Sequence, residues 1–290
     1  MDISIVGAGR AGTALAVLWR RAGHRIVAVS GRDATAERAV RHLPGVPVFD
    51  ASDEADAARG AELVVLAVPD DLIAPTARAF TDAGALGDAR WVAHLSGATP
   101  LSALDAAREA GARRLGVHPL QTFPDVEAAL ERVPGCAVAV GADDDEGFAV
   151  GERLAEDLQG RPFRLADEHR AIYHAAAVFA SNYLVAGTWV AEELLAIAGV
   201  SDPMSALAPL QQATIANMAI ATPAAALTGP AVRGDAGTIA RNIEALAASA
   251  PWAVDAYVEM ARVALDLSVR SGRLSHQGRA GVDEVLARWT

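Results

Sequence analysis

The sequence Val6-Gly7-Ala8-Gly9-Arg10-Ala11-Gly12 places glycines in the spacing G-x-G-x-x-G directly after a β-branched run, Ile3 to Val6. Where a strand turns into a helix, the first glycine permits the tight turn and the second lets the backbone approach a pyrophosphate. The third lets the helix pack closely on the strand, and the helix N-terminus stabilises the anion. We therefore expect residues 7–12 to bind a dinucleotide; the alternative is a glycine-rich turn without a ligand.

Short apolar runs alternate with Ala-rich segments of helical period up to about residue 166. The runs are Ile3 to Val6, Arg25 to Ser30, Val46 to Phe49, Leu63 to Val68, Trp91 to Leu95, Arg114 to Val117, Cys136 to Val140 and Pro162 to Leu165. Strand and helix alternating at this spacing indicate a doubly wound, mostly parallel sheet with helices on both faces.

The pattern changes after residue 166, where no further strand is expected. Helices are predicted at 168–200, 204–221, 236–249, 252–272 and 280–290, separated by Pro and Gly. The first of these reads as one long, uninterrupted helix. We therefore predict an α/β dinucleotide-binding domain at 1–166 and an all-helical substrate and dimerisation domain at 167–290.

The composition excludes several classes of function. The chain has 36 acidic and 25 basic side chains, a formal net charge of −11, which argues against a nucleic-acid binder. All the basic residues are arginines, so Schiff-base chemistry and lysine acids or bases are excluded. The one cysteine, Cys136, allows neither an intrachain disulfide nor a cysteine-rich cluster, and we expect no metal.

Met1-Asp2-Ile3 leads into the first strand run without a signal-peptide pattern, so a cytoplasmic protein is expected. Two uncharged stretches, 171–191 and 203–232, are long enough to cross a bilayer. Polar residues such as His174 and Gln211 interrupt them, which suits helices buried in protein better than helices in lipid. No membrane span is expected.

The end of the second strand run indicates which dinucleotide binds. Ser30 stands where an NAD enzyme usually carries a carboxylate for the ribose 2′-hydroxyl. A small hydroxyl followed by Arg32 suits a 2′-phosphate, so NADP is favoured over NAD. In the alternative, Asp33 takes the acidic role and Arg32 is a solvated surface residue. Further cofactor contacts are expected at the ends of the fourth and fifth runs, namely Val68, Pro69, Asp70, Ser96 and Gly97.

Without lysine, the simplest proton donor or acceptor near neutral pH is a histidine. His118 ends the sixth run, and Pro119 biases it towards an extended backbone, so we expect it to face the cleft. The alternative is a structural histidine bonded to a nearby carbonyl. Gln121, in the same segment, is assigned to substrate binding.

A polar stripe marks the expected long helix. His174 and Ser181 share one face, and Asn182 lies one step round. We assign these three residues to substrate chemistry; the alternative is hydrogen bonding across a helix contact or dimer interface.

A loop from Leu227 to Asp235 runs into a later helix and offers Thr228 and Arg233 to an anionic substrate. In the alternative, Asp235 simply caps the next helix.

Taken together, these residues resemble a superfamily of two-domain NADP-binding oxidoreductases with an all-helical C-terminal dimerisation domain. It includes pyrroline-5-carboxylate reductases, prephenate dehydrogenases, 3-hydroxyacyl-CoA dehydrogenases and ketopantoate reductases. The sequence is most similar to Rossmann-like proteins with a C-terminal domain of unknown function, through the segments 118–123, 173–184 and 227–235.

The resemblance implies that His118 is an acid or base and that Asn182 contacts substrate from an interdomain helix. Two departures stand out. The catalytic lysine of ordinary ketopantoate reductases is missing, so either His174 substitutes for it or the chemistry differs. Leu120 and Gln121 replace the Met and Gly of prephenate dehydrogenases.

The function predicted from the sequence is an NADP-dependent reductase that passes a hydride between NADPH and a small carbonyl or hydroxyl substrate. A ketopantoate-like 2-oxo acid is the leading candidate. The alternatives are a catalytically silent NADP-binding sensor or scaffold, a prephenate-dehydrogenase-like enzyme and a deazaflavin-linked oxidoreductase. The expected partners are the small-molecule substrate and a second copy of the chain, joined through the helical domain, with neither nucleic acid nor membrane.

Overall fold

The computed structural model describes residues 1–32 and 34–289. By internal contacts the chain forms two compact units, Met1–Ala180 and Ser181–Thr290. The domain boundary expected after residue 166 falls inside the first unit, just before helix α8 (Arg170–Ala180). The first unit therefore holds the whole sheet and one helix that the sequence assigned to the second domain.

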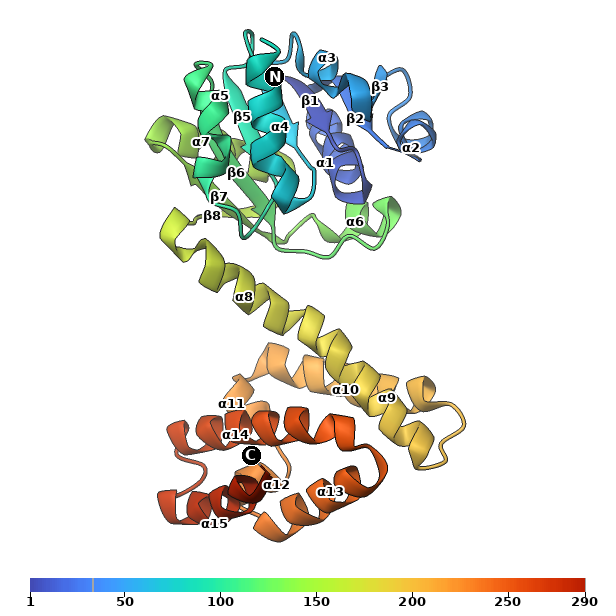
Figure 1. The fold of residues 1–290 in the computed structure, drawn as a ribbon, viewed down its shortest axis with the longest axis vertical. Coiled ribbons are helices and arrows are strands. Elements are labelled where there is room, and N and C mark those ends of the chain that lie inside the picture. Colours follow the sequence, from blue (N-terminus) through green and yellow to red (C-terminus); the bar gives the residue numbers. More distant parts are fainter. Residues whose placement is uncertain (33, 290) are drawn as a thin grey trace. The chain divides into compact units, whose positions relative to one another are not determined.

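An eight-stranded sheet lies at the centre of the first unit, in the order β3-β2-β1-β4-β5-β6-β7-β8 (Figure 1). All neighbours pair in parallel except β6 and β7, which are antiparallel. Every strand predicted from the sequence is present. Their bounds are β1 Asp2–Val6, β2 Arg25–Gly31, β3 Val48–Asp50, β4 Leu63–Leu66, β5 Trp91–His94, β6 Arg113–Pro119, β7 Ala137–Ala142 and β8 Arg161–Arg164.

Two apolar layers cover the two faces of this sheet, as the doubly wound pattern predicts. In β4, Leu63 and Val65 pack into the layer under α1 and α6, whereas Val64 and Leu66 pack into the layer under α4 and α5. The helices of this unit are α1 Arg10–Arg21, α2 Thr35–His42, α3 Glu54–Ala58, α4 Asp70–Asp82, α5 Asp105–Glu109, α6 Val126–Arg132, α7 Asp145–Asp157 and α8 Arg170–Ala180, with 3-10 turns at Ala51–Asp53, Leu101–Leu104 and Asp167–His169.

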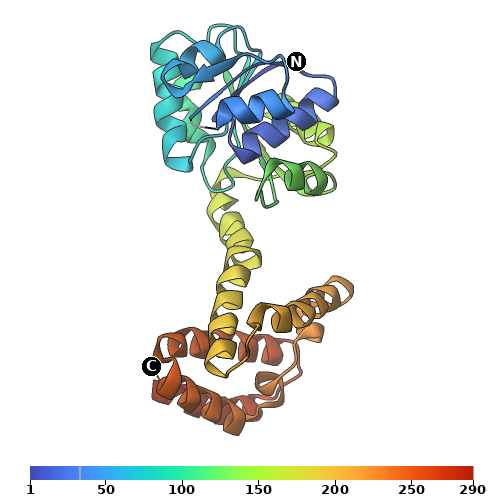
Figure 2. The ribbon, with the colours of Figure 1, turned by 90° about the vertical axis from the view of Figure 1, so that its right-hand side faces the viewer.

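The described part of the second unit is helical throughout (Figures 1 and 2). Its core joins residues of α12, α13, α14 and α15, among them Ile239, Ile243, Val258 and Leu265. The helices are α9 Asn182–Ile197, α10 Pro203–Ile220, α11 Pro223–Ala226, α12 Pro230–Arg233, α13 Ala236–Ser249, α14 Val254–Arg270 and α15 His276–Leu286, with 3-10 turns at Pro251–Ala253 and Ala287–Trp289.

The prediction of one helix over 168–200 is wrong. Helix α8 ends at Ala180, and Ser181 has φ −124° and ψ −67°, outside the helical region, before α9 begins at Asn182. The side chains of Ser and Asn compete with helical backbone hydrogen bonds, which explains a break at this pair. The sequence pattern predicted that His174 and Ser181 share one face of a continuous helix. Because the helix ends between them, this prediction is wrong.

Among the described helices, none combines the length and the apolar character needed to cross a membrane.

Candidate functional site

The glycine turn between β1 and α1 is shaped by two close approaches. Gly7 has φ +84°, and a Cβ there would lie 2.7 Å from the carbonyl oxygen of Ala67. A Cβ on Gly12 would lie 2.9 Å from the carbonyl oxygen of Gly7. At Gly9 the nearest atom to such a Cβ is the Gly7 oxygen, 3.9 Å away. Gly7 and Gly12 thus permit packing, whereas Gly9 leaves the backbone at the start of α1 open.

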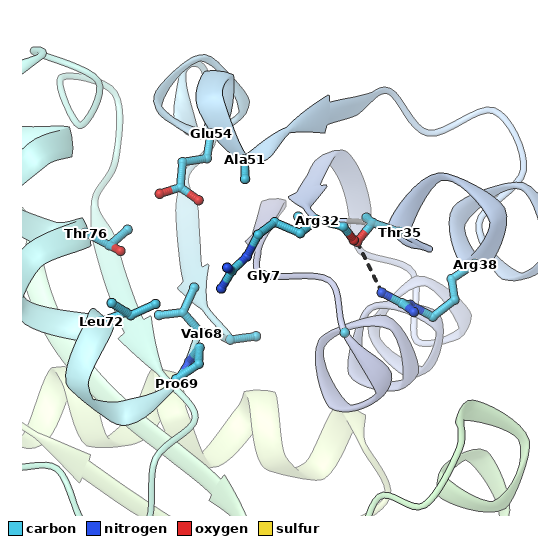
Figure 3. Close-up of a pocket in the computed structure, with 13 residues that line it drawn as sticks. Gly7, Arg32, Thr35, Arg38, Ala51, Glu54, Val68, Pro69, Leu72 and Thr76 are labelled. Atoms are coloured by element: carbon cyan, nitrogen blue, oxygen red, sulfur yellow. Dashed lines mark hydrogen bonds between the residues drawn. The ribbon is translucent and has the colours of Figure 1, made fainter.

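A cavity of about 480 Å³ adjoins this turn (Figure 3). Five of the residues expected to contact the cofactor line it: Gly7, Gly9, Arg32, Val68 and Pro69. The remaining lining residues come from the ends of β2 and β4 and from the helices and the 3-10 turn that follow β2, β3 and β4: Gly31, Thr35, Arg38, Ala51, Glu54, Ala67, Leu72 and Thr76. The cavity thus lies at the carboxyl edge of the parallel strands, where open α/β sheets bind ligands.

Two guanidinium groups and one carboxylate give this cavity a positive balance among its described lining residues. The Arg32 side chain reaches into the space between Glu54 and Val68 (Figure 3). Arg38 donates from Nη2 to the Thr35 hydroxyl, 3.2 Å away, and from Nε to the Ala8 carbonyl, also 3.2 Å away. Burial raises the pKa of Glu54, and Arg32 opposes that shift. This charge balance suits an anionic ligand.

Ser30 does not have the place that the sequence analysis gave it. Its side chain is fully buried, its hydroxyl has no hydrogen-bonding partner among the described residues, and it does not line the cavity. Its carbonyl oxygen instead accepts the N–H groups of Gly7 and Ala8, at 3.0 and 2.7 Å. Because successive side chains in a strand point to opposite faces of the sheet, a position at the end of β2 does not by itself place the hydroxyl at the cavity. Asp33, the residue of the alternative interpretation, lies outside the described residues.

The other predicted cofactor residues are not among the described residues that line the cavity. Arg10 donates to the carbonyl of Pro124, 2.9 Å away, and Ala11 follows it in the first turn of α1. The Ser96 hydroxyl donates to Asp70 Oδ2, 2.7 Å away, and accepts the N–H groups of Ala98 and Thr99. This bond ties the loop after β5 to the start of α4.

His118 lies near the end of β6, with its imidazole ring against Gly97. A Cβ on Gly97 would be 2.9 Å from Cε1 and 3.0 Å from Nε2 of that ring, so only glycine leaves room for the ring there. Nδ1 lies 2.7 Å from the Tyr173 hydroxyl of α8. Burial lowers the pKa of His118 to about 4, His174 and Arg170 add to the decrease, and Asp70 opposes it.

A buried arginine, Arg170, contributes to the electrostatic surroundings of His118. The Arg170 side chain is 1% exposed and passes so close to Gly116 and Gly141 that a Cβ at either position would collide with its guanidinium. Its Nε donates to Asp167, 2.7 Å away, and its Nη1 donates to the Ser96 carbonyl, 3.3 Å away. The guanidinium therefore anchors α8 to the sheet.

This cation also influences a second histidine. His94 is fully buried in β5, and neither ring nitrogen has a hydrogen-bonding partner among the described residues. Its pKa is lowered to about 3, mainly by burial and in addition by Arg170 and His118, while the backbone of Ser96 acts in the opposite direction. The carboxyl edge beside His118 thus holds neutral imidazoles next to a permanent positive charge.

The predicted substrate residues are divided between the two units. His174 lies in the first unit with His118, and its Nδ1 is buried with no partner among the described residues. Ser181 and Asn182 begin the second unit, which also contains Thr228 and Arg233. A shared site of these residues stays a prediction.

Two of the residues assigned to substrate binding, Gln121 and Arg233, have partners close by in the sequence. Gln121 donates from Nε2 to the Arg132 carbonyl, 3.2 Å away, and its Oε1 accepts the N–H of Thr122, so its amide holds the loop after β6. Arg233 is exposed and lies 3.9 Å from Asp235. Asp235 caps α13 by accepting the N–H of Thr238, which confirms the capping alternative for that residue.

Sequence reasoning missed Arg38, Glu54, Arg170 and Tyr173. A signal for Arg38 existed, because Thr35 and Arg38 are three residues apart on the helix that follows Arg32 and so share a face. Tyr173 stands beside His174 in a segment that the sequence analysis used, but its pairing with His118 spans 55 residues and is set by the fold.

Two family models match the chain. Residues 1–119 match a Rossmann-like domain, and residues 136–264 match a domain of unknown function, DUF2520. The chain thus joins a Rossmann-like domain to a DUF2520 domain, in agreement with the resemblance found from the sequence.

A curated relative from Rhizobium johnstonii, named glycerol-3-phosphate dehydrogenase (NAD(P)+), is 33% identical over 183 residues, which cover 57% of this chain and 52% of the relative. The chain therefore spans about half the length of the curated relatives it matches.

Solved structures resemble nearly the whole chain. A Bacteroides fragilis protein described as an NADP oxidoreductase is 26% identical, covers 91% of this chain and 98% of its own, and has a TM-score of 0.73. Pyrroline carboxylate reductase of Plasmodium falciparum, solved with NADP bound, covers 92% of this chain and 98% of its own at 15% identity with a TM-score of 0.57, and shows the fold. These names agree with the predicted class, a dinucleotide-dependent oxidoreductase.

The first and second glycines of the motif should respond differently to the same substitution. Gly9→Ala places a methyl in open space and should change the free energy of unfolding by no more than about 0.5 kcal/mol, while weakening NADPH binding at least about tenfold. Gly7→Ala should destabilise the protein by roughly 1–2 kcal/mol from its positive φ alone, with the clash at Ala67 in addition. Urea unfolding and NADPH titration measure both. Wild-type affinity in a stable Gly9→Ala protein would contradict this account.

Proposed function

We propose that the protein is an NADP-dependent oxidoreductase that reduces a small carbonyl substrate or oxidises the corresponding alcohol. The observation that carries this proposal is the cavity at the glycine turn, where the open backbone of Gly9 and the N-terminus of α1 lie beside Arg32 and Arg38. A helix N-terminus presents unpaired N–H groups and a positive partial charge to an anion. The names of the relatives support the same class.

The residues of the cavity fit a dinucleotide with a 2′-phosphate. The start of α1 would hold the pyrophosphate, and Arg32, Arg38 and the Thr35 hydroxyl would hold the 2′-phosphate through charge-assisted hydrogen bonds. Gly31 ends β2 without a carboxylate that would repel this phosphate. When bound, the reduced cofactor supplies the hydride, and the chain's own residues bind and orient the substrate.

His118 is the proposed partner of the substrate oxygen. With a pKa of about 4, its imidazole is neutral at pH 7, and only roughly one molecule in a thousand would carry the imidazolium form. A neutral imidazole still donates one N–H hydrogen bond, which stabilises negative charge that develops on an oxygen. His174 would assist or bind a carboxylate, and Ser181 and Asn182 would orient the substrate.

A ketopantoate-like 2-oxo acid is the proposed substrate. The residues that we propose to contact this substrate are Thr228, Arg233 and Gln121. Glycerol 3-phosphate, the substrate in the name of the curated relatives, is a second small anion with a hydroxyl that can be oxidised. Two alternative functions differ from this proposal. A prephenate-dehydrogenase-like enzyme would act on another substrate, and a deazaflavin-linked enzyme would transfer the hydride to another acceptor. A silent sensor would bind NADPH without turnover.

A cytoplasmic homodimer is the proposed state of the protein. Helices α9 and α10 expose large apolar side chains, among them Val185 (68% exposed) and Leu210 (65% exposed), and α10 contains no charged residue. Burial of such a surface against a second copy would remove apolar area from water.

The cofactor proposal predicts a preference that depends on two arginines. NADPH should bind at least about tenfold more tightly than NADH, because a charge-assisted hydrogen bond contributes roughly 1.5–3 kcal/mol. Arg32→Ala and Arg38→Ala should each reduce this ratio, as measured by fluorescence titration of both cofactors. Arg41→Ala, on the same helix as Arg38 but outside the cavity wall, is the matched control. Equal wild-type affinities, or an unchanged ratio in both variants, would overturn the NADP assignment.

The proposed role of His118 predicts a slower reaction without a loss of cofactor affinity. His118→Asn should slow NADPH oxidation with ketopantoate by roughly 10²-fold or more, because loss of one hydrogen-bond donor to a developing oxyanion costs about 10²–10³ in rate, while NADPH affinity stays near wild type. Single-turnover kinetics across pH measure the step. His174→Asn is the companion variant: if it alone shows the loss, the histidine roles are reversed. If NADPH binds but neither a panel of 2-oxo acids nor glycerol 3-phosphate is turned over, the enzyme proposal is wrong and the protein is interpreted as a sensor.

The dimer proposal predicts a sedimenting species of twice the 29.9 kDa chain mass at micromolar concentration. Leu210→Arg should shift the protein towards the monomer, because it puts a charge into the proposed apolar contact. Val40→Arg, at an exposed apolar position of α2 in the first unit, should leave the mass unchanged. A wild-type monomer at this concentration would contradict the proposal.

A further inference from the structure

The Tyr173 side chain is held in place by rings from two strands. Its hydroxyl oxygen lies 2.7 Å from Nδ1 of His118, and the two rings meet edge to face at 89° with centroids 5.5 Å apart. Phe163 of β8 also packs edge-on against Tyr173, with a centroid distance of 5.9 Å. The contact between Tyr173 and His118 thus links α8 to the end of β6 inside the first unit.

Hydrogen-bond chemistry indicates which atom donates in this contact. A phenol hydroxyl is a stronger donor than the N–H of a neutral imidazole, and an imidazole nitrogen is a stronger acceptor than a phenol oxygen. If Nδ1 donated instead, the Tyr173 hydroxyl proton would have no acceptor among the described residues. Burial raises the pKa of Tyr173 to about 12, so the hydroxyl keeps its proton at neutral pH.

Burial is the main reason that the His118 ring stays neutral, and its charged surroundings add to this effect. Arg170 and His174 face it from α8 and His94 lies beside it in β5, whereas Asp70, at the start of α4, acts in the opposite direction. A neutral imidazole has a single N–H, and a hydrogen bond accepted at one nitrogen leaves that proton on the other.

Nε2 is the nitrogen that remains available. Among the described residues it has no hydrogen-bonding partner, and the side chain is partly exposed. Gly97, by lacking a side chain, leaves room for this part of the ring.

We propose that Tyr173 is a positioning residue: its hydroxyl donates to Nδ1 and holds His118 in the Nε2–H tautomer, so that Nε2–H is the donor offered to a substrate carbonyl oxygen. The substrate part of this statement rests on the proposed function. The tautomer does not, because it is a property of the free protein. Tyr173 itself touches neither substrate nor cofactor in this arrangement.

The test is the position of the imidazole proton in the full-length, ligand-free protein at pH 7. Long-range ¹H–¹⁵N correlation spectra of ¹⁵N-labelled protein distinguish a protonated from a bare ring nitrogen, and His118→Asn identifies the signals by their loss. The wild type should show His118 with a proton on Nε2 and a bare Nδ1. In Tyr173→Phe the ratio of tautomers should move about three- to tenfold towards Nδ1–H, the range that corresponds to loss of one ordinary hydrogen bond.

Tyr257→Phe is the matched control, because the Tyr257 hydroxyl accepts from Asn242 Nδ2, 2.9 Å away, in the second unit. It should leave the His118 signals unchanged. A wild-type His118 with its proton on Nδ1 would overturn the proposal. The wild-type spectrum therefore tests the tautomer even if Tyr173→Phe does not fold. An unchanged tautomer ratio in a folded Tyr173→Phe protein would overturn it as well.

The spectra separate this proposal from the proposed function. If the protein fails to oxidise NADPH with any carbonyl substrate, the oxidoreductase proposal fails while the tautomer assignment stands on the spectra. If turnover occurs, Tyr173→Phe should lower kcat with ketopantoate and leave the Kd for NADPH unchanged.

Discussion

The close packing of the first helix against the ends of β1 and β4 is the constraint on which the proposed site depends. Gly7 and Gly12 have no side chains, so α1 can begin directly beneath Ala67 and aim its N-terminus along the carboxyl edge of the sheet. A Cβ at either position would collide with a backbone carbonyl oxygen, that of Ala67 or that of Gly7. Because α1 also supplies much of one apolar layer, the same contact serves folding and ligand binding.

A second constraint is the burial of a permanent positive charge at that edge. Burial is the main cause that lowers the pKa of His118 and of His94, and the positive charge of Arg170 acts in the same direction, so both imidazoles stay neutral. In a chain without lysine, this favours a neutral N–H donor over a cationic acid at the proposed reaction centre. The buried guanidinium requires two glycines, Gly116 and Gly141, on adjacent strands, which shows how far the sheet is adapted to hold it.

Much of the fold could be predicted from the sequence, because strands and Ala-rich helices alternate with a clear period. All eight strands are present, and the turn at residues 7–12 lies where the motif places it. The helix break at Ser181 could not be predicted from periodicity, because the apolar pattern continues across it. The burial of the Ser30 hydroxyl depends on which face of β2 each side chain occupies, which spacing from the first glycine does not reveal.

Less of the candidate site than of the fold could be predicted from the sequence, because its side chains interact through tertiary contacts. His118 could be selected by its place at a strand end, but its tautomer and charge depend on Tyr173 and Arg170, which only the fold brings close. Similarly, Arg32 follows its strand directly, whereas Glu54 reaches the cavity from a separate helix. Position along the chain therefore predicts which residues lie at the carboxyl edge, and tertiary packing decides how they interact.

Hydrogen–deuterium exchange of the full-length protein with and without NADPH tests the central claim most directly, namely that a dinucleotide binds at the glycine turn. The account predicts slower amide exchange in residues 9–13 at the start of α1 and in residues 34–38, where Thr35 and Arg38 line the cavity. Exchange that is unchanged in both segments at saturating NADPH, or protection confined to the helical unit after Ser181, would contradict it.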